Sequence, residues 1–139
     1  MLLLNPKKVV ERRVRWVRAL LSGEYKQGTG VLKKLVSGGA EHCCLGVGCE
    51  VIAPHSTDLS TYIIMGKTKL SWRNARKLGL TTQAQSVATI WNDTYQHSFA
   101  TIADYIAYAT ENDLSLRSIR TNSVPKGYAR EWLTKYDED

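Results

Sequence analysis

The 139-residue chain has only three cysteines and no long apolar run. Three is an odd count, unlike the even counts of secreted disulfide-rich domains. No apolar run approaches the roughly 18 residues that a membrane-spanning helix needs. The apolar patch at the start is short and precedes the first lysines, which is the wrong order for a secretory signal. We therefore expect a cytoplasmic protein with reduced thiols, no membrane association and no disulfide framework.

The common catalytic and cofactor motifs are also missing. The sequence contains no G-x-S-x-G, H-E-x-x-H or paired-carboxylate pattern. The glycine pairs at 28/30 and 46/48 lack the third glycine of a dinucleotide fingerprint, and no G-K-[S/T] follows either of them. We expect no cofactor. One alternative is an enzyme with an unfamiliar acid–base site, because Asn92, Asp93 and His97 come close together in the sequence.

All three cysteines lie in one stretch, HCCLGVGCEV, which begins at His42. A zinc ion would want four donors, and two nitrogens and two sulfurs are offered by His42, Cys44, Cys49 and His55, but their spacing fits no common zinc module. The flanking residues are apolar, and free cysteine is among the most buried residue types. We predict that Cys44 and Cys49 are buried, reduced and free of metal.

What the chain does have is a basic first third. Residues 1–40 hold nine Lys or Arg and two Glu, a net charge of +7. Residues 41–139 hold ten basic and eleven acidic side chains, a net charge of −1. This asymmetry is typical of a protein with an anionic partner, although a solvated helix face that maintains solubility gives the same pattern.

Periodicity predicts one α+β domain over residues 1–139, with helices packed on a small antiparallel sheet. A Gly38-Gly39 hairpin turn would join a strand to its partner. The apolar stripe Val10, Val14, Val17, Leu21, Phe99, Ile102 and Ile106 should be buried. The expected helices are 7–22, 44–53, 71–79, 82–91, 98–109 and a terminal helix around 128–136. The expected strands are 29–36 with its partner 41–43, and 62–70.

Several short motifs carry a resemblance. RWVRALLSGEYKQGTGVL, CCLGVGCEV, ARKLGL, IWND and SFATIADYI follow one another in this order. In that order they resemble a family of small uncharacterised bacteriophage proteins over roughly residues 15–108. The resemblance implies a phage protein in the host bacterial cytoplasm and supplies no activity or catalytic residues. Residues 110–139 depart from the pattern and read as a C-terminal extension of a 1–109 family-like core.

The segment YKQGTGVLKK is the best candidate for an anion site. Glycines can expose successive backbone N–H groups as an anion-binding nest, and nearby lysines add charge. Tyr25 would offer a stacking surface, and the preceding helix would add an arginine. The predicted contact residues are Arg12, Tyr25, Lys26, Gln27, Gly28, Gly30 and Lys33.

The leading hypothesis is a phage accessory protein, with counter-defence as one role, that sequesters an anionic partner such as a nucleotide-type ligand without transforming it. A second hypothesis is a nucleic-acid binder that places Arg12, Arg15 and Arg18 on phosphates. A third is an inhibitor that binds a host protein. The sequence leaves the oligomeric state open, a homo-oligomer included.

Overall fold

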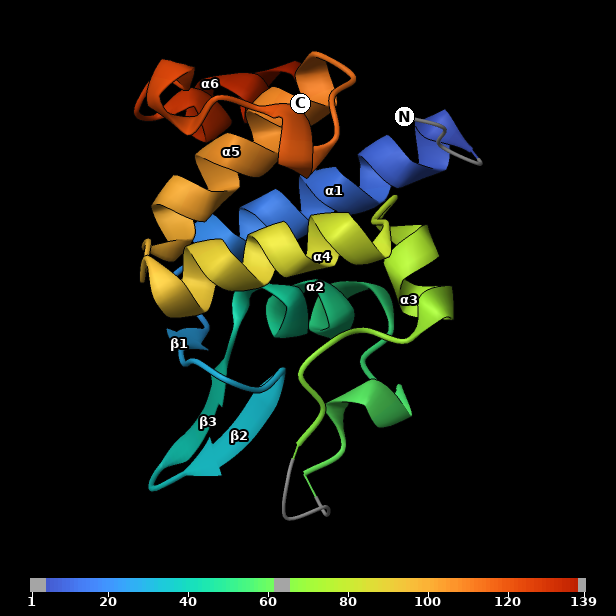
Figure 1. The fold of residues 1–139 in the computed structure, drawn as a ribbon, viewed down its shortest axis with the longest axis vertical. Coiled ribbons are helices and arrows are strands. Elements are labelled where there is room, and N and C mark those ends of the chain that lie inside the picture. The colour runs from blue at the N-terminus through green and yellow to red at the C-terminus, as the bar shows by residue number, and fades with distance from the viewer. Residues whose placement is uncertain (1–4, 62–65, 138–139) are drawn as a thin grey trace.

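The computed structural model describes residues 5–61 and 66–137 and confirms a single α+β domain (Figure 1). Its helices are α1 (Pro6–Leu21), α2 (Cys44–Ile52), α3 (Trp72–Lys77), α4 (Thr82–Thr89), α5 (Phe99–Glu111) and α6 (Tyr128–Leu133). Its strands are β1 (Lys26–Gln27), β2 (Lys33–Val36) and β3 (Gly39–His42). A π-helical turn, Ile90–Thr94, extends α4, and short 3-10 turns connect the remaining elements. None of the helices in these described ranges is long and apolar enough to cross a membrane.

Helix α1 begins where the sequence predicts. The Asn5 side chain accepts a hydrogen bond from the backbone N–H of Lys8 at 3.3 Å, and Pro6 occupies the first turn, where its missing N–H costs nothing. The helix ends at Leu21, Ser22 is its C-cap, and Gly23 follows with a φ of 78°. The prediction of a helix over 7–22 is confirmed.

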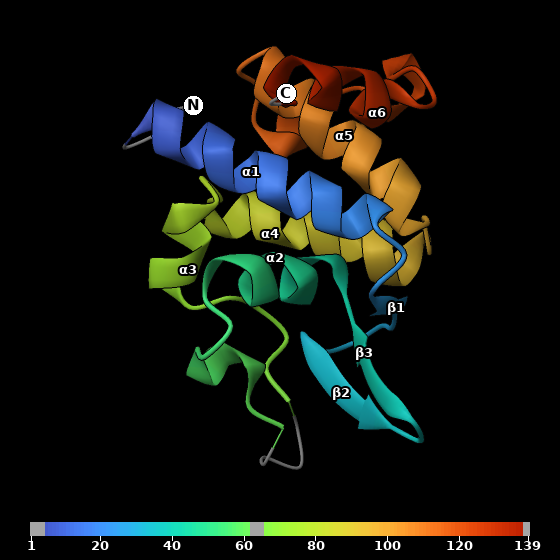
Figure 2. The same ribbon diagram turned by 180° about the vertical axis from the view of Figure 1, so that it is seen from behind.

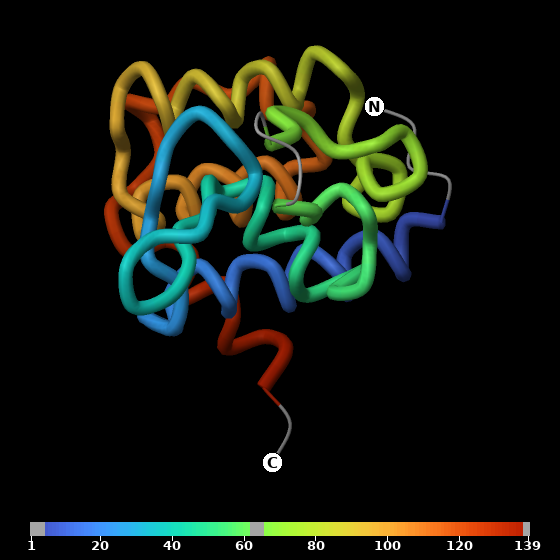
Figure 3. The backbone as a smooth tube through the Cα atoms, turned by 90° about the horizontal axis from the view of Figure 1, so that it is seen from below, coloured from blue at the N-terminus to red at the C-terminus, as the bar shows by residue number. Residues whose placement is uncertain are grey.

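Helix α2 lies at the centre of the molecule, between α1 and α4 (Figure 3). A Cβ atom at Gly46 would lie 1.8 Å from the carbonyl oxygen of Leu32, so only glycine fits there. A Cβ at Gly48 would lie 2.9 Å from the Leu78 side chain. The Trp16 indole N–H donates to the carbonyl of Cys44 at 2.9 Å and fixes α1 across the start of α2. Both glycines lower the helical propensity of α2, but they allow the Leu32 backbone and the Leu78 side chain to pack closely against it.

The sheet differs from the prediction. Its order is β1-β3-β2, with β2–β3 antiparallel and β1–β3 parallel, so the sheet is mixed. The Gly38-Gly39 hairpin is confirmed, with a φ of 85° at Gly38. Residues 66–70 form no strand, and 62–65 lie outside the described residues. The strand predicted over 29–36 is β2, which starts only at Lys33. Leu32, just before it, turns inward: it is fully buried, and its N–H donates to the carbonyl of Lys67 at 2.7 Å.

The helices pack mainly on one another, and the β2–β3 hairpin projects from one end of the helical body (Figures 1 and 2). The strands are two to four residues long, and most of their side chains are exposed or half-buried. Such a sheet has too little apolar surface to support two helices. Helices α1 and α5 therefore pack on each other, whereas the sequence predicts helices packed on the sheet.

The predicted core stripe is largely confirmed. On α5, Phe99, Ile102 and Ile106 are buried, as are Val14 and Val17 on α1. Val10 and Leu21 are only half-buried, because the buried face of α1 is rotated slightly from the predicted one. The buried face contains Val9, Arg13, Trp16, Val17 and Leu20 in addition to Val14.

Arg13 is a charged residue inside this face, with 1% of its surface exposed. Its guanidinium donates to the carbonyls of Leu78 at 2.8 Å and Gly79 at 3.1 Å, and to the Thr110 hydroxyl at 3.1 Å. Burial lowers its pKa to about 10, against the opposing effect of Asp113. The side chain remains charged at neutral pH and joins α1, the turn after α3, and α5.

The C-terminal segment is anchored on α5 through one carboxylate. Asp104 accepts hydrogen bonds from the backbone N–H groups of Gly127 at 2.9 Å and Ala129 at 2.8 Å, at the start of α6. Gly127 has a φ of 83°, so it can turn the chain into the helix. Trp132 of α6 is buried. Residues 110–137 are thus part of the same hydrophobic core as the rest of the chain.

Replacing Arg13 with Met should destabilise the fold by about 3 kcal/mol, because it leaves two buried carbonyls without donors. Urea unfolding followed by circular dichroism measures the effect. Lys8→Met, an exposed substitution earlier on α1, is the control and should stay within about 0.5 kcal/mol of the parent. Equal unfolding midpoints for both variants would show that the buried guanidinium contributes nothing.

Candidate functional site

The predicted ligand loop is held by a buried amide. Asn92, 1% exposed, accepts hydrogen bonds from the Gln27 side chain at 3.0 Å and the Cys44 backbone N–H at 3.1 Å. Its NH₂ group donates to the carbonyl of Gly28 at 2.9 Å and to Asp93 at 2.7 Å. The two sites that the sequence suggests separately, one around residues 25–33 and one around Asn92, therefore form a single region.

The predicted ligand loop, residues 25–33, which we call the glycine loop, already binds a carboxylate of the protein itself. The backbone N–H of Gly30 donates to the Asp93 carboxylate at 3.1 Å. Lys26 pairs with Glu41 at 3.4 Å, and Lys33 pairs with Glu50 at 3.3 Å. The charge that the loop would present to an external ligand is consequently reduced by acidic groups of the fold.

The remaining predicted residues have different surroundings. Tyr25 packs edge-on against the His42 ring, with the centroids 5.3 Å apart, and burial and then Glu50 raise its pKa. Arg12 lies against α3, where it donates to the carbonyl of Lys77 at 3.3 Å. On the same helix, Arg15 donates to the carbonyl of Val51, and Arg18 pairs with Asp137 at 3.1 Å. The three arginines of the second hypothesis therefore contact three separate segments.

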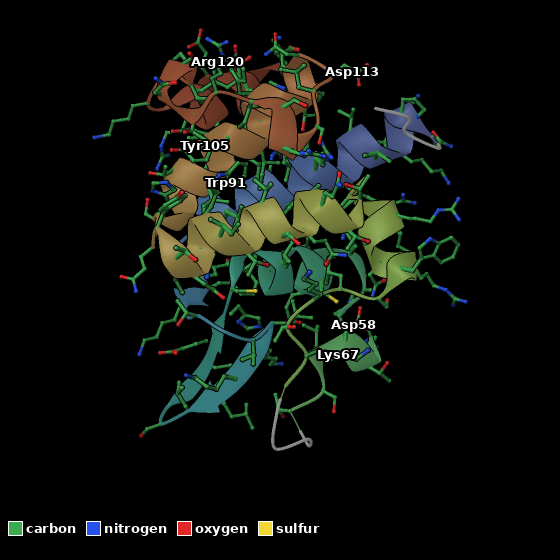
Figure 4. All side chains as sticks on the ribbon, viewed as in Figure 1. Asp58, Lys67, Trp91, Tyr105, Asp113 and Arg120 are labelled. Carbon is green, nitrogen blue, oxygen red and sulfur yellow. The ribbon has the colours of Figure 1, made fainter. Side chains whose placement is uncertain are left out.

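Asn92, Asp93 and His97 come together, and the Asn92 amide, the Asp93 carboxylate and the His97 carbonyl all bond to other groups of the fold. The carbonyl of His97 accepts from the Gln27 side chain at 2.8 Å. The His97 ring packs edge-on against Tyr105 at 5.5 Å, and Tyr105 in turn contacts Trp91 at 4.9 Å (Figure 4). Because Asn92 already uses both amide atoms, this group offers no free amide to position a substrate.

The three cysteines are buried and form no disulfide. Burial raises the thiol pKa of Cys43 and Cys49 to about 11, and it raises that of Cys44 as well. The predicted burial is confirmed. Among the described residues, no cluster of three or more His, Cys, Asp or Glu side chains is arranged to hold a metal ion.

A different part of the molecule carries cations that form no ion pair with a carboxylate of the described residues. A hollow of about 230 Å³ between α1 and α3 is lined by Arg12, Trp72, Arg73, Arg76 and Lys77, together with Asn5 and Val9. A second hollow, of about 550 Å³, lies between α3 and the start of α4 and includes Lys69. Trp72 and Arg76 line both hollows. We call Arg12, Lys69, Arg73, Arg76 and Lys77, with Trp72, the cationic surface.

Trp72 is the most exposed large apolar side chain of the described residues, at 70%. The Arg76 guanidinium lies 4.3 Å from the centroid of its ring, a cation–π contact. Within residues 5–61 and 66–137, none of the five cations of the cationic surface pairs with a carboxylate. This surface can therefore offer both positive charge and an aromatic face to a partner.

Sequence reasoning missed this surface, apart from Arg12. Residues 66–90 contain five Lys or Arg and no acid, but their charge disappears in an average over residues 41–139. The net charge summed in a short window moved along the sequence would have identified residues 66–90 as basic. No such window could have shown that the α3 cations lie near Arg12, since α1 and α3 are far apart in the sequence.

Buried polar contacts fix the start of α3 and hence the position of Trp72. The Ser71 hydroxyl caps the helix by accepting from the Asn74 N–H. The buried Asp58 carboxylate accepts from the Ser71 backbone N–H at 2.8 Å, from Lys67 at 2.9 Å and from the Asn74 side chain at 2.9 Å (Figure 4). Burial alone would raise the Asp58 pKa, but these donors outweigh it and lower the pKa from 3.8 to about 2.

Comparison with protein families gives one assignment. A family model described as domain of unknown function DUF8296 matches residues 8–125, so the chain belongs to this family. The match extends beyond residues 15–108 at both ends and includes most of α1 and all of α2 to α5. No curated protein and no solved structure matches the chain.

Asp58 should make stability depend on pH in the acid range. Its folded pKa of about 2 lies below the ordinary 3.8, so it stabilises the fold above about pH 4. This contribution, about 2 kcal/mol, is lost as the pH falls from 4 towards 2. Urea unfolding across this range should give a shallower pH dependence for Asp58→Asn than for the parent. Glu11→Gln serves as the exposed control, and an unchanged slope in Asp58→Asn would contradict the assignment.

The native thiols should react slowly with a thiol reagent at pH 8, because they are buried and hold their protons above that pH. Adding urea should then release three reactive thiols per chain. Rapid labelling of the native protein, or metal analysis that finds zinc at about one per chain, would mean that the cysteine stretch has a chemical role.

Proposed function

We propose that this DUF8296 protein binds nucleic acid, without transforming it, through the cationic surface. The observation that carries the proposal is the group of five cations around the exposed Trp72, none of which forms an ion pair with a carboxylate in the part of the chain that the structure describes. Lys and Arg contribute to nucleic-acid affinity by releasing counterions from the phosphate backbone. The exposed Trp72 ring among them adds an aromatic face on which a base can stack.

The spread of the cations over the cationic surface favours the binding of an extended polyanion over that of a small anion. The cations come from α1, from α3 and from Lys69, and they line two open hollows that share Trp72 and Arg76. A polymer that carries regularly spaced charge can contact several of these groups at once. This supports the nucleic-acid hypothesis, with α3 in place of the Arg15 and Arg18 side chains.

The nucleotide-type ligand at residues 25–33 is the less favoured hypothesis. Lys26 and Lys33 are paired with glutamates, and the Gly30 N–H is bonded to Asp93. An external anion would have to displace or approach these carboxylates, and like charges repel. The loop is better explained as a structural connection between α1 and the sheet.

The setting that we propose is a bacterial cytoplasm during phage infection. The support for it is the motif resemblance to bacteriophage proteins. Both phage and host nucleic acids are available there as polyanions. A counter-defence role would then follow if the nucleic acid bound is one that a host system recognises.

Two double charge reversals separate the hypotheses. Arg73→Glu/Arg76→Glu should weaken binding of a mixed-sequence nucleic acid, and it should lower the slope of log affinity against log salt by about two, one for each lost phosphate contact. Lys26→Glu/Lys33→Glu is the matched control and should bind like the parent. Fluorescence anisotropy at salt concentrations from about 50 to 200 mM measures both quantities.

The opposite pattern would overturn the proposal. If Arg73→Glu/Arg76→Glu binds as the parent does, while Lys26→Glu/Lys33→Glu loses affinity for ATP, the anion site predicted from the glycine loop is the functional one. If the parent binds neither nucleic acid nor ATP at low salt, the cationic surface belongs to a protein–protein contact. Circular dichroism confirms that each variant is folded.

A further inference from the structure

Helices α3 and α4 form a helix-turn-helix unit. The turn between them, residues 78–81, contains Gly79 with a φ of 68°, a left-handed conformation that favours glycine. The backbone N–H groups of Leu78 and Leu80 both donate to the carbonyl of Ala75, at 3.1 and 2.9 Å, and close the turn. Figure 1 shows α3 standing at one end of α4, which runs across the front of the molecule. A short turn of this kind, with glycine, is typical of the motif.

The inner face of the unit is fixed on the core. Five apolar side chains of the unit are buried against the core, namely Ala75, Leu78, Leu80, Ala84 and Ala88. Arg13 from α1 donates to the carbonyls of Leu78 and Gly79. The turn is therefore rigidly held, and α4 has a fixed orientation relative to the cationic surface.

The outer face of α4 is polar and uncharged. Thr82 and Gln83 are exposed and Ser86 is half-buried. The helix, TQAQSVAT, contains no charged side chain. Cations flank this face, because Lys69 donates to the Ser86 hydroxyl at 3.0 Å and Arg117 donates to the Gln83 amide oxygen at 2.7 Å.

We propose that α4 is a recognition helix that enters the major groove of double-stranded DNA. Thr82, Gln83 and Ser86 contact base edges, and Lys69, Arg117 and the α3 cations contact phosphates on either side. In such complexes residues near the start of the second helix contact base edges, and contacts to phosphates position the protein on the duplex. Glutamine pairs in a bidentate manner with adenine, and serine and threonine bond to any base. The inference rests on the proposed function and adds to it the duplex and the sequence preference.

A single strand fits the same surface less well. Proteins that bind single strands without sequence preference stack successive bases on several aromatic rings. Here Trp72 is the only exposed tryptophan in the described ranges, and Arg76 lies over its ring. A duplex, in contrast, matches this surface. The neutral face of α4 can contact base edges in a groove, and the cations beside it can contact phosphates.

Selection from a random duplex pool tests the inference. The parent protein should enrich one sequence pattern. Gln83→Ala should bind a mixed-sequence duplex as the parent does, but should lose about tenfold of its preference at one base position. Asn122→Ala removes an exposed amide outside α4 and should keep the full preference. Both substitutions are at exposed positions, so the thermal midpoints should not change.

The outcomes separate the inference from the function on which it rests. If the parent binds duplex through Arg73 and Arg76 but enriches no pattern, or binds single strands more tightly than duplex, the recognition helix is rejected and nucleic-acid binding stands. If Gln83→Ala retains every preference of the parent, the base contact is rejected. If the parent binds no nucleic acid at low salt, both proposals fail.

Discussion

The buried guanidinium of Arg13 is the constraint on which the arrangement of α1, α3 and α5 depends. A cation removed from water is strongly destabilising unless hydrogen bonds replace its hydration. Here two carbonyls at the end of α3 and the Thr110 hydroxyl supply them. Because these groups come from distant segments, the charge is satisfied only when all three helices are in place. The same contact sets the distance between α1 and α3, and hence the hollow that Arg12 lines with the α3 cations.

Local signals predicted the helices well and the sheet poorly. Asn5, Ser71 and Ser98 cap helices through hydrogen bonds to residues three positions away, so a short window contains the whole interaction. The parallel pairing of β1 with β3 has no such local cause. It depends on Asn92, which bonds the Gln27 side chain and the Gly28 carbonyl from more than sixty positions away. The rotated face of α1 escaped prediction because an arginine on a helix normally marks the solvent side.

The candidate site was predictable only in part for a related reason. The glycine loop was recognised by composition, but its ion pairs involve Glu41 and Glu50, whose positions depend on the hairpin and on α2. Seen in sequence, Lys26 and Lys33 look available; in the fold they are partly neutralised. Trp72 shows the opposite case. It follows a helix cap and looks like a core residue, yet the contacts of Asp58 with Ser71 and Asn74 hold α3 so that this side chain faces water.

The polar residues therefore fall into two classes. In one class the hydrogen-bonding groups are all engaged within the protein, and in the other they face water. A buried amide such as Asn92, with donors and acceptors all engaged, gains nothing from a ligand and would lose its bonds to one. The exposed guanidinium groups of Arg73 and Arg76 have the reverse balance, since they face water and a phosphate can replace that water at little cost. The Trp72 ring beside Arg76 adds an exposed aromatic face. On this argument the Asn92 region stabilises the fold, and the α3–α4 face is the surface where we propose that an anionic partner binds.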